Sequence, residues 1–207
     1  MLFRSHDFTH QDENFRNFIQ AAYQKYLGRL PDQAGLDAWA LAMETQGLSD
    51  ERLEAGFIGS DEYIALHGGK GAGWVQGMYH DLLGRAPSDA EVNGWVNALN
   101  NGVSPSAVAF GFAASAEREG QRVQSNYKTY LGRFASPEEA SGWVNAFTAG
   151  QITNEDMQAG FMASVGYYND PLKGRGTNAD WVASIYQDVL HRAGTPDEIS
   201  IWAGSLQ

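Results

Sequence analysis

The stretch Tyr23-Gln24-Lys25-Tyr26-Leu27-Gly28-Arg29 returns three more times in altered form and decides how the chain folds. The later copies begin at Tyr79, Tyr127 and Tyr186 and end at Arg85, Arg133 and Arg192. Ten residues after each arginine stands a tryptophan: Trp39, Trp95, Trp143 or Trp202. The copies start 56, 48 and 59 residues apart, so a fixed unit is joined by connections of varying length.

Each copy carries its own helix boundaries. Glycine after leucine is typical of a helix that ends in a left-handed residue, and it stands at Gly28, Gly84 and Gly132, with His191 in the fourth copy. Three residues past each arginine stands a residue that favours a helix start: Asp32, Ser88, Ser136 or Thr195. In three copies a glutamate three residues later completes a capping box, namely Glu91, Glu139 and Glu198. Gly35 replaces it in the first copy and predicts a weaker cap.

A further helix of each of the first three copies ends in Gly-Phe-x-x-Ser, which contains Phe57, Phe112 and Phe161. The apolar residues of the first helix, such as Phe15, Ile19 and Tyr26, recur at helical spacing. Alternation of period two, which would indicate strands, is nowhere sustained. The sequence therefore predicts an all-α fold of tandem helical repeats of about 50 residues, three helices each, with a partial fourth unit.

The expected organisation is an N-terminal extension, two whole repeats around a linker, a third repeat, a second linker and the partial repeat. In chain order these are the extension 1–14, repeat 1 at 15–66, the linker 67–73, repeat 2 at 74–119, repeat 3 at 120–168, the linker 169–179 and the partial repeat 4 at 180–207. The repeated tyrosines, tryptophans and phenylalanines are expected at structural positions, with the four tryptophans in the core. The fourth repeat lacks a third helix, so either the chain is cut from something longer or residues 1–14 fill that role.

Composition excludes several classes of function. The chain has 207 residues, 24 of them glycine and none cysteine, which rules out disulfides, thiolate metal sites and cysteine nucleophiles. Fourteen basic residues against 25 acidic ones give a net charge of −11, and no basic patch favours nucleic acid. The longest apolar run, Ala107 to Ala114, is far shorter than the ~20 residues that span a bilayer. We therefore expect no nucleic-acid partner and no membrane insertion.

With these residues placed, the first repeat resembles the bacterial domain of unknown function 4214 family, which is itself similar to phycobilisome linker domains. The matching residues are Tyr23, Leu27, Gly28, Arg29, Pro31, Asp32, Gly35, Leu36, Trp39, Gly47, Ser49, Phe57, Ser60, Glu62 and Tyr63. The later repeats depart from the pattern, for example at Glu91-Val92 and Glu139-Ala140. The resemblance implies a module of a secreted or cell-surface bacterial protein, and it supplies no catalytic residues. An extracellular or cell-surface location is expected, although a cytoplasmic one is not excluded.

Two sets of residues are candidates for binding a ligand. The arginines Arg29, Arg85, Arg133 and Arg192 can offer guanidinium groups to an acidic or polyhydroxylated ligand, or each can instead satisfy its own helix end or stack on a ring. Trp74 and Trp181 each start a helix just after a linker. We expect their rings to be partly exposed and suited to packing on a sugar.

The sequence gives little support for a metal site or a catalytic site. His6 and His10 have the spacing to hold a divalent ion, but no further ligand is indicated, so no metal and no cofactor are expected. No nucleophile motif is present, and the chain is not expected to be an enzyme. The resulting hypothesis is a non-catalytic binding or anchoring module for a polysaccharide or a neighbouring surface protein. The alternatives are a scaffold or linker that spaces or assembles other domains and, less favoured, a hydrolase acting through carboxylates.

Overall fold

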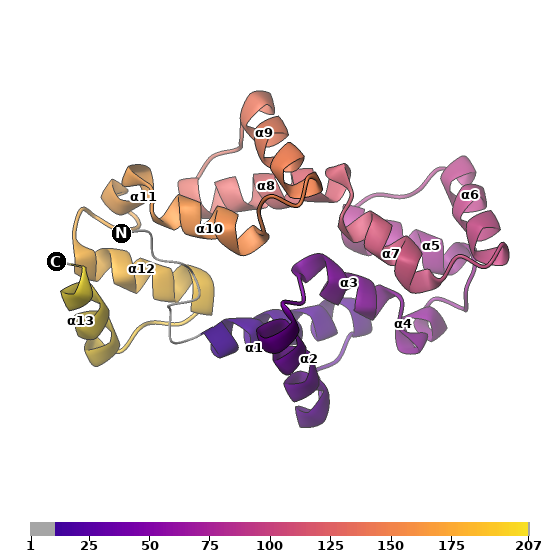
Figure 1. Ribbon diagram of the computed structural model, residues 1–207, viewed down its shortest axis with the longest axis horizontal. Coiled ribbons are helices and arrows are strands. Elements are labelled where there is room, and N and C mark those ends of the chain that lie inside the picture. Colours follow the sequence, from indigo (N-terminus) through magenta and orange to yellow (C-terminus); the bar gives the residue numbers. More distant parts are fainter. Residues whose placement is uncertain (1–10, 207) are drawn as a thin grey trace. The chain divides into compact units, whose positions relative to one another are not determined.

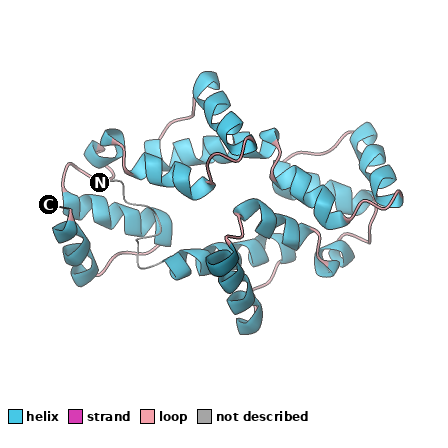
Figure 2. Cartoon of the chain, in the orientation of Figure 1, coloured by secondary structure: helices cyan, strands magenta, loops and turns pink. Residues whose placement is uncertain are grey.

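The computed structural model describes residues 11–206, and over that range every regular element is a helix (Figures 1 and 2). The chain divides into two compact bodies. The N-terminal body comprises residues 15–121, and the C-terminal body comprises the described residues 11–14 and 122–206. Each body holds two of the four repeats.

The N-terminal body contains repeats 1 and 2. Its first helix runs on directly into a π-helical turn, as does the first helix of repeat 2. The elements of repeat 1 are α1 (Gln11–Ala22) with its turn (Tyr23–Leu27), α2 (Gln33–Gln46), α3 (Asp50–Ile58) and the short α4 (Asp61–Leu66). Those of repeat 2 are α5 (Ala72–Met78) with its turn (Tyr79–Leu83), α6 (Asp89–Asn100) and α7 (Pro105–Ala113).

The C-terminal body contains repeats 3 and 4 in the same order of helices. It is made of α8 (Ala116–Leu131) from residue 122 onward, α9 (Pro137–Thr148), α10 (Asn154–Met162), the short α11 (Val165–Asn169), α12 (Asn178–Leu190) and α13 (Pro196–Ser205). Helix α8 runs without a break through the boundary expected between residues 119 and 120, because nothing between Ala116 and Leu131 interrupts helical hydrogen bonding. Repeats 2 and 3 are therefore joined by a helix rather than by a loop.

Helix ends lie where local chemistry predicts them. Gly28, Gly84 and Gly132 adopt φ values of 66°, 65° and 66°, and His191 takes the same left-handed conformation with φ 56°. The predicted capping boxes form at Ser88, Ser136 and Thr195. At the first repeat Asp32 accepts one bond from the Gly35 amide. The repeat is thus a set of strongly punctuated short helices.

The core of each body is aromatic. In the N-terminal body Trp74, Tyr63 and Ile19 are completely buried, and α3 packs along α7. In the C-terminal body Tyr167, Met157 and Tyr186 are completely buried. No helix formed by residues 11–206 is long and apolar enough to cross a membrane. The prediction of an all-α repeat fold is confirmed.

Candidate functional site

Each repeat builds a cluster around its arginine, which we call the arginine cluster. The guanidinium lies over the ring of the repeated tyrosine, which stands six residues before it in the chain, close enough for a cation–π interaction. The distances from the guanidinium carbon to the ring centroid are 5.0 Å for Arg29 on Tyr23, 4.8 Å for Arg85 on Tyr79, 4.9 Å for Arg133 on Tyr127 and 5.1 Å for Arg192 on Tyr186. In every cluster the arginine Nη1 also donates to the next residue's carbonyl.

The same tyrosine contacts the repeated phenylalanine and tryptophan. Edge-to-face packing joins Tyr23 to Phe57, Tyr79 to Phe112 and Tyr127 to Phe161, with centroids 4.7, 4.7 and 4.8 Å apart. The indole nitrogens of Trp95 and Trp143 donate to the tyrosine hydroxyls at 3.2 Å. All four repeat tryptophans, Trp202 included, are half-buried against these cores rather than enclosed by them. Their indole rings are therefore committed mainly to internal packing.

Two carboxylates hold the arginine in repeats 2 and 4. Arg85 donates Nη2 to Glu91 Oε1 at 3.0 Å and Nε to Glu117 Oε1 at 2.7 Å. Glu91 belongs to the capping box, and Glu117 lies in the helix that follows Ser115. Arg192 makes the same two pairs, with Glu198 at 2.9 Å and with Glu13 at 2.6 Å. Glu13 therefore takes in repeat 4 the place that Glu117 has in repeat 2.

Repeats 1 and 3 each lack one of these carboxylates. Arg29 pairs with Glu62 through Nε at 2.6 Å, but Gly35 stands where the capping-box glutamate would be. Arg133 pairs with the capping-box Glu139 at 2.7 Å. Gly166 stands where Glu62 and Glu117 are found in the other repeats, two residues after the serine.

Charge pairing sets the electrostatics of the clusters. Hydrogen bonds from the arginines, followed by those from the cap residues, lower the pKa of Glu91, Glu139 and Glu198 from 4.5 to about 2. The hydrogen bond from Arg29 likewise lowers the pKa of Glu62. All of these carboxylates are thus ionised near neutral pH. A carboxylate of the protein itself fills the Nε edge of three of the four predicted arginine ligand sites, and Arg133 is the exception.

One of the two tryptophans expected to bind sugar, Trp74, is placed differently from expectation. Trp74 is fully buried, with its indole nitrogen donating to the Ile58 carbonyl at 2.8 Å, so the expected partly exposed ring is wrong for this residue. Trp181 is half-buried and donates in the same way to Met162 at 2.7 Å. Each indole nitrogen thus bonds to the last residue of the third helix of the preceding repeat, which is α3 for Trp74 and α10 for Trp181.

Sequence reasoning missed a set of buried polar pairs between neighbouring helices. The Tyr63 hydroxyl donates to Asp81 Oδ2 at 2.7 Å, and in the other body Tyr167 donates to Asp188 Oδ2 at 2.8 Å. Burial, reinforced by the aspartates, raises the pKa of both tyrosines well above its usual value. The repeat pattern could have indicated these pairs. Tyr63 and Tyr167 each stand three residues after the serine of Gly-Phe-x-x-Ser, and Asp81 and Asp188 each stand two residues after the repeated tyrosine.

A further missed pair lies at the start of α8. Arg118 Nη2 donates to Glu54 Oε1 at 2.6 Å, and the Tyr26 hydroxyl donates to the same oxygen at 2.8 Å. Both side chains of the ion pair are largely buried. Arg118 takes the repeat position of Tyr63 and Tyr167, so repeat 2 replaces a tyrosine–aspartate bond with an ion pair.

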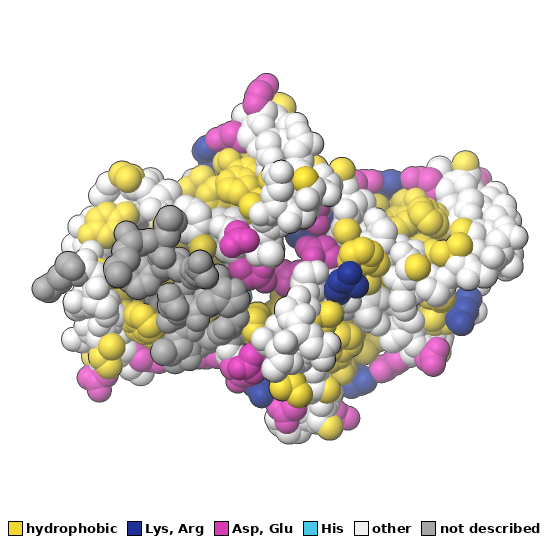
Figure 3. All heavy atoms as spheres, in the orientation of Figure 1, with side chains coloured by type: hydrophobic (Ala, Val, Ile, Leu, Met, Phe, Trp, Pro, Cys, Tyr) yellow, Lys and Arg dark blue, Asp and Glu magenta, His cyan; other side chains and the backbone are white. Residues whose placement is uncertain are grey.

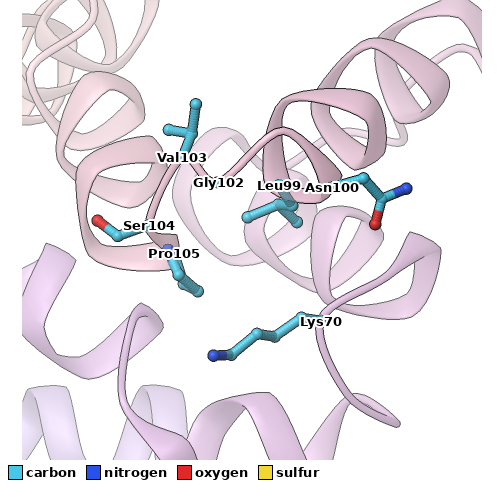
Figure 4. Close-up of a pocket in the computed structure, with 7 residues that line it drawn as sticks. All are labelled: Lys70, Leu99, Asn100, Gly102, Val103, Ser104 and Pro105. Carbon is cyan, nitrogen blue, oxygen red and sulfur yellow. The ribbon is translucent and has the colours of Figure 1, made fainter.

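The remaining candidate sites, a surface pocket and the predicted histidine pair, give less support for a function. A shallow pocket lies between the first linker and the connection from α6 to α7, with Lys70 reaching toward Pro105 (Figure 4). Lys70 is its one charged lining residue, so it presents no acid–base pair. His6 and His10 lie outside the described residues. Among residues 11–206 no group of three or more histidines and carboxylates is arranged to hold a metal ion.

The fold and the repeated clusters define an all-α protein built from tandem repeats. A family model described as a domain of unknown function, DUF4214, matches residues 1–67 and again residues 55–122. The two matches together cover residues 1–122, more than half of the 207-residue chain, and the chain belongs to this family. No curated protein matches the chain. No solved structure matches it either.

Proposed function

We propose that the chain is a non-catalytic binding module that recognises a partner protein at a bacterial cell surface. The observation that carries the proposal is one exposed position, which directly follows the arginine of each cluster. Leu30 and Phe134 occupy it in repeats 1 and 3 and are 67% and 68% exposed. Alanine stands there in repeats 2 and 4, at Ala86 and Ala193.

Large apolar side chains are held in water at the same place in both bodies, each beside a fixed guanidinium. Apolar surface gains free energy when a partner covers it, at about 25 cal/mol per Å². An arginine next to an apolar anchor is a composition typical of protein interfaces. Figure 3 shows hydrophobic side chains exposed beside acidic and basic ones over α8 and α9.

A protein partner is favoured over a polysaccharide because of what the aromatic rings do. Trp74 is enclosed, and Trp95 and Trp143 use their indole nitrogens on tyrosine hydroxyls. A leucine at position 30 also lacks the flat face that packs on a pyranose ring. The expected location at the cell surface rests on the family resemblance and on the acidic composition.

The proposal is tested by comparing the wild-type chain with the double variant Leu30→Ser/Phe134→Ser on immobilised bacterial surface proteins and on a glycan array. Leu172→Ser/Ile201→Ser is the matched control, because these residues are 83% and 68% exposed but lie outside the repeated position. We expect a protein ligand whose retention falls at least tenfold in the first variant and is unchanged in the second. Glycan binding that survives both changes, or no binding of any kind, would overturn the proposal, and the latter result would favour the scaffold alternative.

A further inference from the structure

The Nε edge of the arginine is filled by a glutamate in three of the four arginine clusters. Nε donates to Glu62 at 2.6 Å in repeat 1, to Glu117 at 2.7 Å in repeat 2 and to Glu13 at 2.6 Å in repeat 4. In each case Nη2 donates to the second oxygen of the same carboxylate, at 2.7, 3.1 and 3.0 Å. The fold therefore uses this edge as a bidentate receptor for one carboxylate.

Arg133 has the same receptor without its carboxylate. Its Nη1 donates to the Phe134 carbonyl and to Glu139 Oε2, and its Nη2 donates to Glu139 Oε1. A guanidinium carries five N–H groups in a rigid fork, so the Nε–H and one Nη2–H remain, side by side. Within the part of the chain that the structure describes, neither of them has an acceptor. The side chain is 52% exposed.

The place of the absent carboxylate is open space. A Cβ atom added at Gly166 would meet nothing closer than Ser164 Oγ, at 3.7 Å. The other absent carboxylate, at Gly35 in repeat 1, has its place filled, because a Cβ there would lie 2.6 Å from the Tyr23 hydroxyl. Only repeat 3 thus combines an open guanidinium edge with room for a ligand.

The local charge favours an anion at this place. Lys128 extends from α8 over the Phe134 ring, with its ammonium 5.7 Å from the ring centroid and 3.4 Å from the Gly132 carbonyl. The other repeats have Gln24, His80 and Gln187 at this position. Glu139 alone is paired with Arg133, and the neighbouring Glu138 accepts from Ser136. Repeat 3 therefore has one more cation and one fewer carboxylate than repeat 2 around its arginine.

We propose that the Nε edge of Arg133 binds the carboxylate of a glutamate side chain on a partner polypeptide. Phe134 and Val165, which directly follow Arg133 and precede Gly166, are 68% and 76% exposed, and a free carboxylic acid would leave them uncovered. The inference rests on the proposed function as a binding module and names the group that the module recognises.

The probe is the chain's own segment that fills the receptor in repeat 1, the peptide of residues 60–66 (Ser-Asp-Glu-Tyr-Ile-Ala-Leu), with its ends blocked. Its matched control carries glutamine in place of Glu62. Because one solvent-exposed pair binds weakly, each peptide is titrated to millimolar concentration into the full-length ¹⁵N-labelled chain. The readout is the chemical shift of the Arg133 Nε–H, assigned with Arg133→Lys. N-acetylglutamate is titrated in parallel as the free carboxylate.

We expect the glutamate peptide to shift the Arg133 Nε–H saturably, at least threefold more tightly than N-acetylglutamate, while the glutamine peptide has no effect. Gly166→Glu fills the receptor internally and abolishes the response, whereas Gly166→Gln, of the same size, retains it. A response to N-acetylglutamate equal to that of the peptide would overturn the polypeptide as the source. An unresponsive Arg133, or equal loss in both Gly166 variants, would overturn the site. If the peptide does not bind at Arg133 but retention of a protein ligand still depends on Leu30 and Phe134, the carboxylate site is overturned and the proposed function stands.

Discussion

The Arg192 guanidinium and the Glu13 carboxylate form a bidentate ion pair although 179 residues separate them in the chain. Glu13 stands ten residues before Tyr23, as Glu117 stands ten residues before Tyr127. Helix α1 is thus the counterpart of α8: its first turn serves repeat 4 and its remainder serves repeat 1. Glu13 thus supplies one of the two carboxylates of the repeat-4 arginine cluster.

Glu13→Gln is expected to lower the thermal stability of the protein, because it leaves the Nε edge of Arg192 without its charged acceptor. The loss should shrink in high salt, since both side chains are about one-third exposed and the pair is screened. Thermal melts at low and high ionic strength measure it. Glu44→Gln, at an exposed site outside the arginine clusters, is the control. Equal melting temperatures for the two variants would show that the pair contributes nothing.

Acid should weaken the fold through the capping-box glutamates. Their pKa is about 2 in the folded chain against 4.5 ordinarily. A lowered folded pKa contributes stability that is complete above about pH 4.5 and is lost as the pH falls toward 2. Urea midpoints measured from pH 6 to pH 2 should fall over that window, and less steeply in Glu139→Gln. A variant with the same steepness as the wild type would contradict this assignment.

Trp74 and Trp95 differ in how deeply their rings are buried, so replacing them should cost different amounts of stability. Trp74→Ala should cost about 3–5 kcal/mol of unfolding free energy, because it empties a fully enclosed site. Trp74→Phe should cost about 1–3 kcal/mol, because the Ile58 carbonyl loses its donor. Trp95→Ala should cost less than Trp74→Ala, because the Trp95 ring is only half-buried. Denaturant unfolding of the three variants measures the order, and a larger loss for Trp95→Ala would refute it.

The buried ion pair of the N-terminal body gives a further prediction. Arg118→Met should destabilise the fold by about 3–5 kcal/mol, because it leaves the buried Glu54 carboxylate without its cation. Adding Glu54→Gln should recover part of the loss, because the uncompensated charge is then gone. Chemical denaturation of the single and double variants completes the cycle. Purely additive losses would show that the two side chains do not interact.

Local chemistry was predictable from the sequence, and distant contacts were not. The caps at Ser88 and Ser136 and the left-handed turn at His191 depend on neighbouring residues alone, so the spacing of the repeat was sufficient to place them. The burial of Trp74 depends on the Ile58 carbonyl, which a folded linker brings to it. A position just after a linker therefore gave a misleading impression of exposure.

Part of the candidate site could be predicted from the sequence. The sequence left two interpretations open for all four arginines, ligand binding or bonding within the protein. The second included the stacking on an aromatic ring that the structure shows. The distinction between Arg133 and the other three required knowing which carboxylates reach each guanidinium. Gly166 held the signal, because aligning the serines Ser60, Ser115 and Ser164 places it opposite Glu62 and Glu117.

Repeat 3 differs from the other repeats in its unfilled carboxylate receptor at Arg133. The most direct measurement is a double-mutant cycle of thermal stability in which Gly166→Glu is compared with Gly166→Gln, in the wild-type chain and with Arg133→Gln. With Arg133 present, glutamate should give a higher melting temperature than glutamine, and this advantage should shrink when Arg133 is replaced. The dipole of α11 favours any acid in its first turn, but that contribution does not depend on Arg133 and cancels in the cycle. An advantage of glutamate that is independent of Arg133 would contradict the assignment of this receptor.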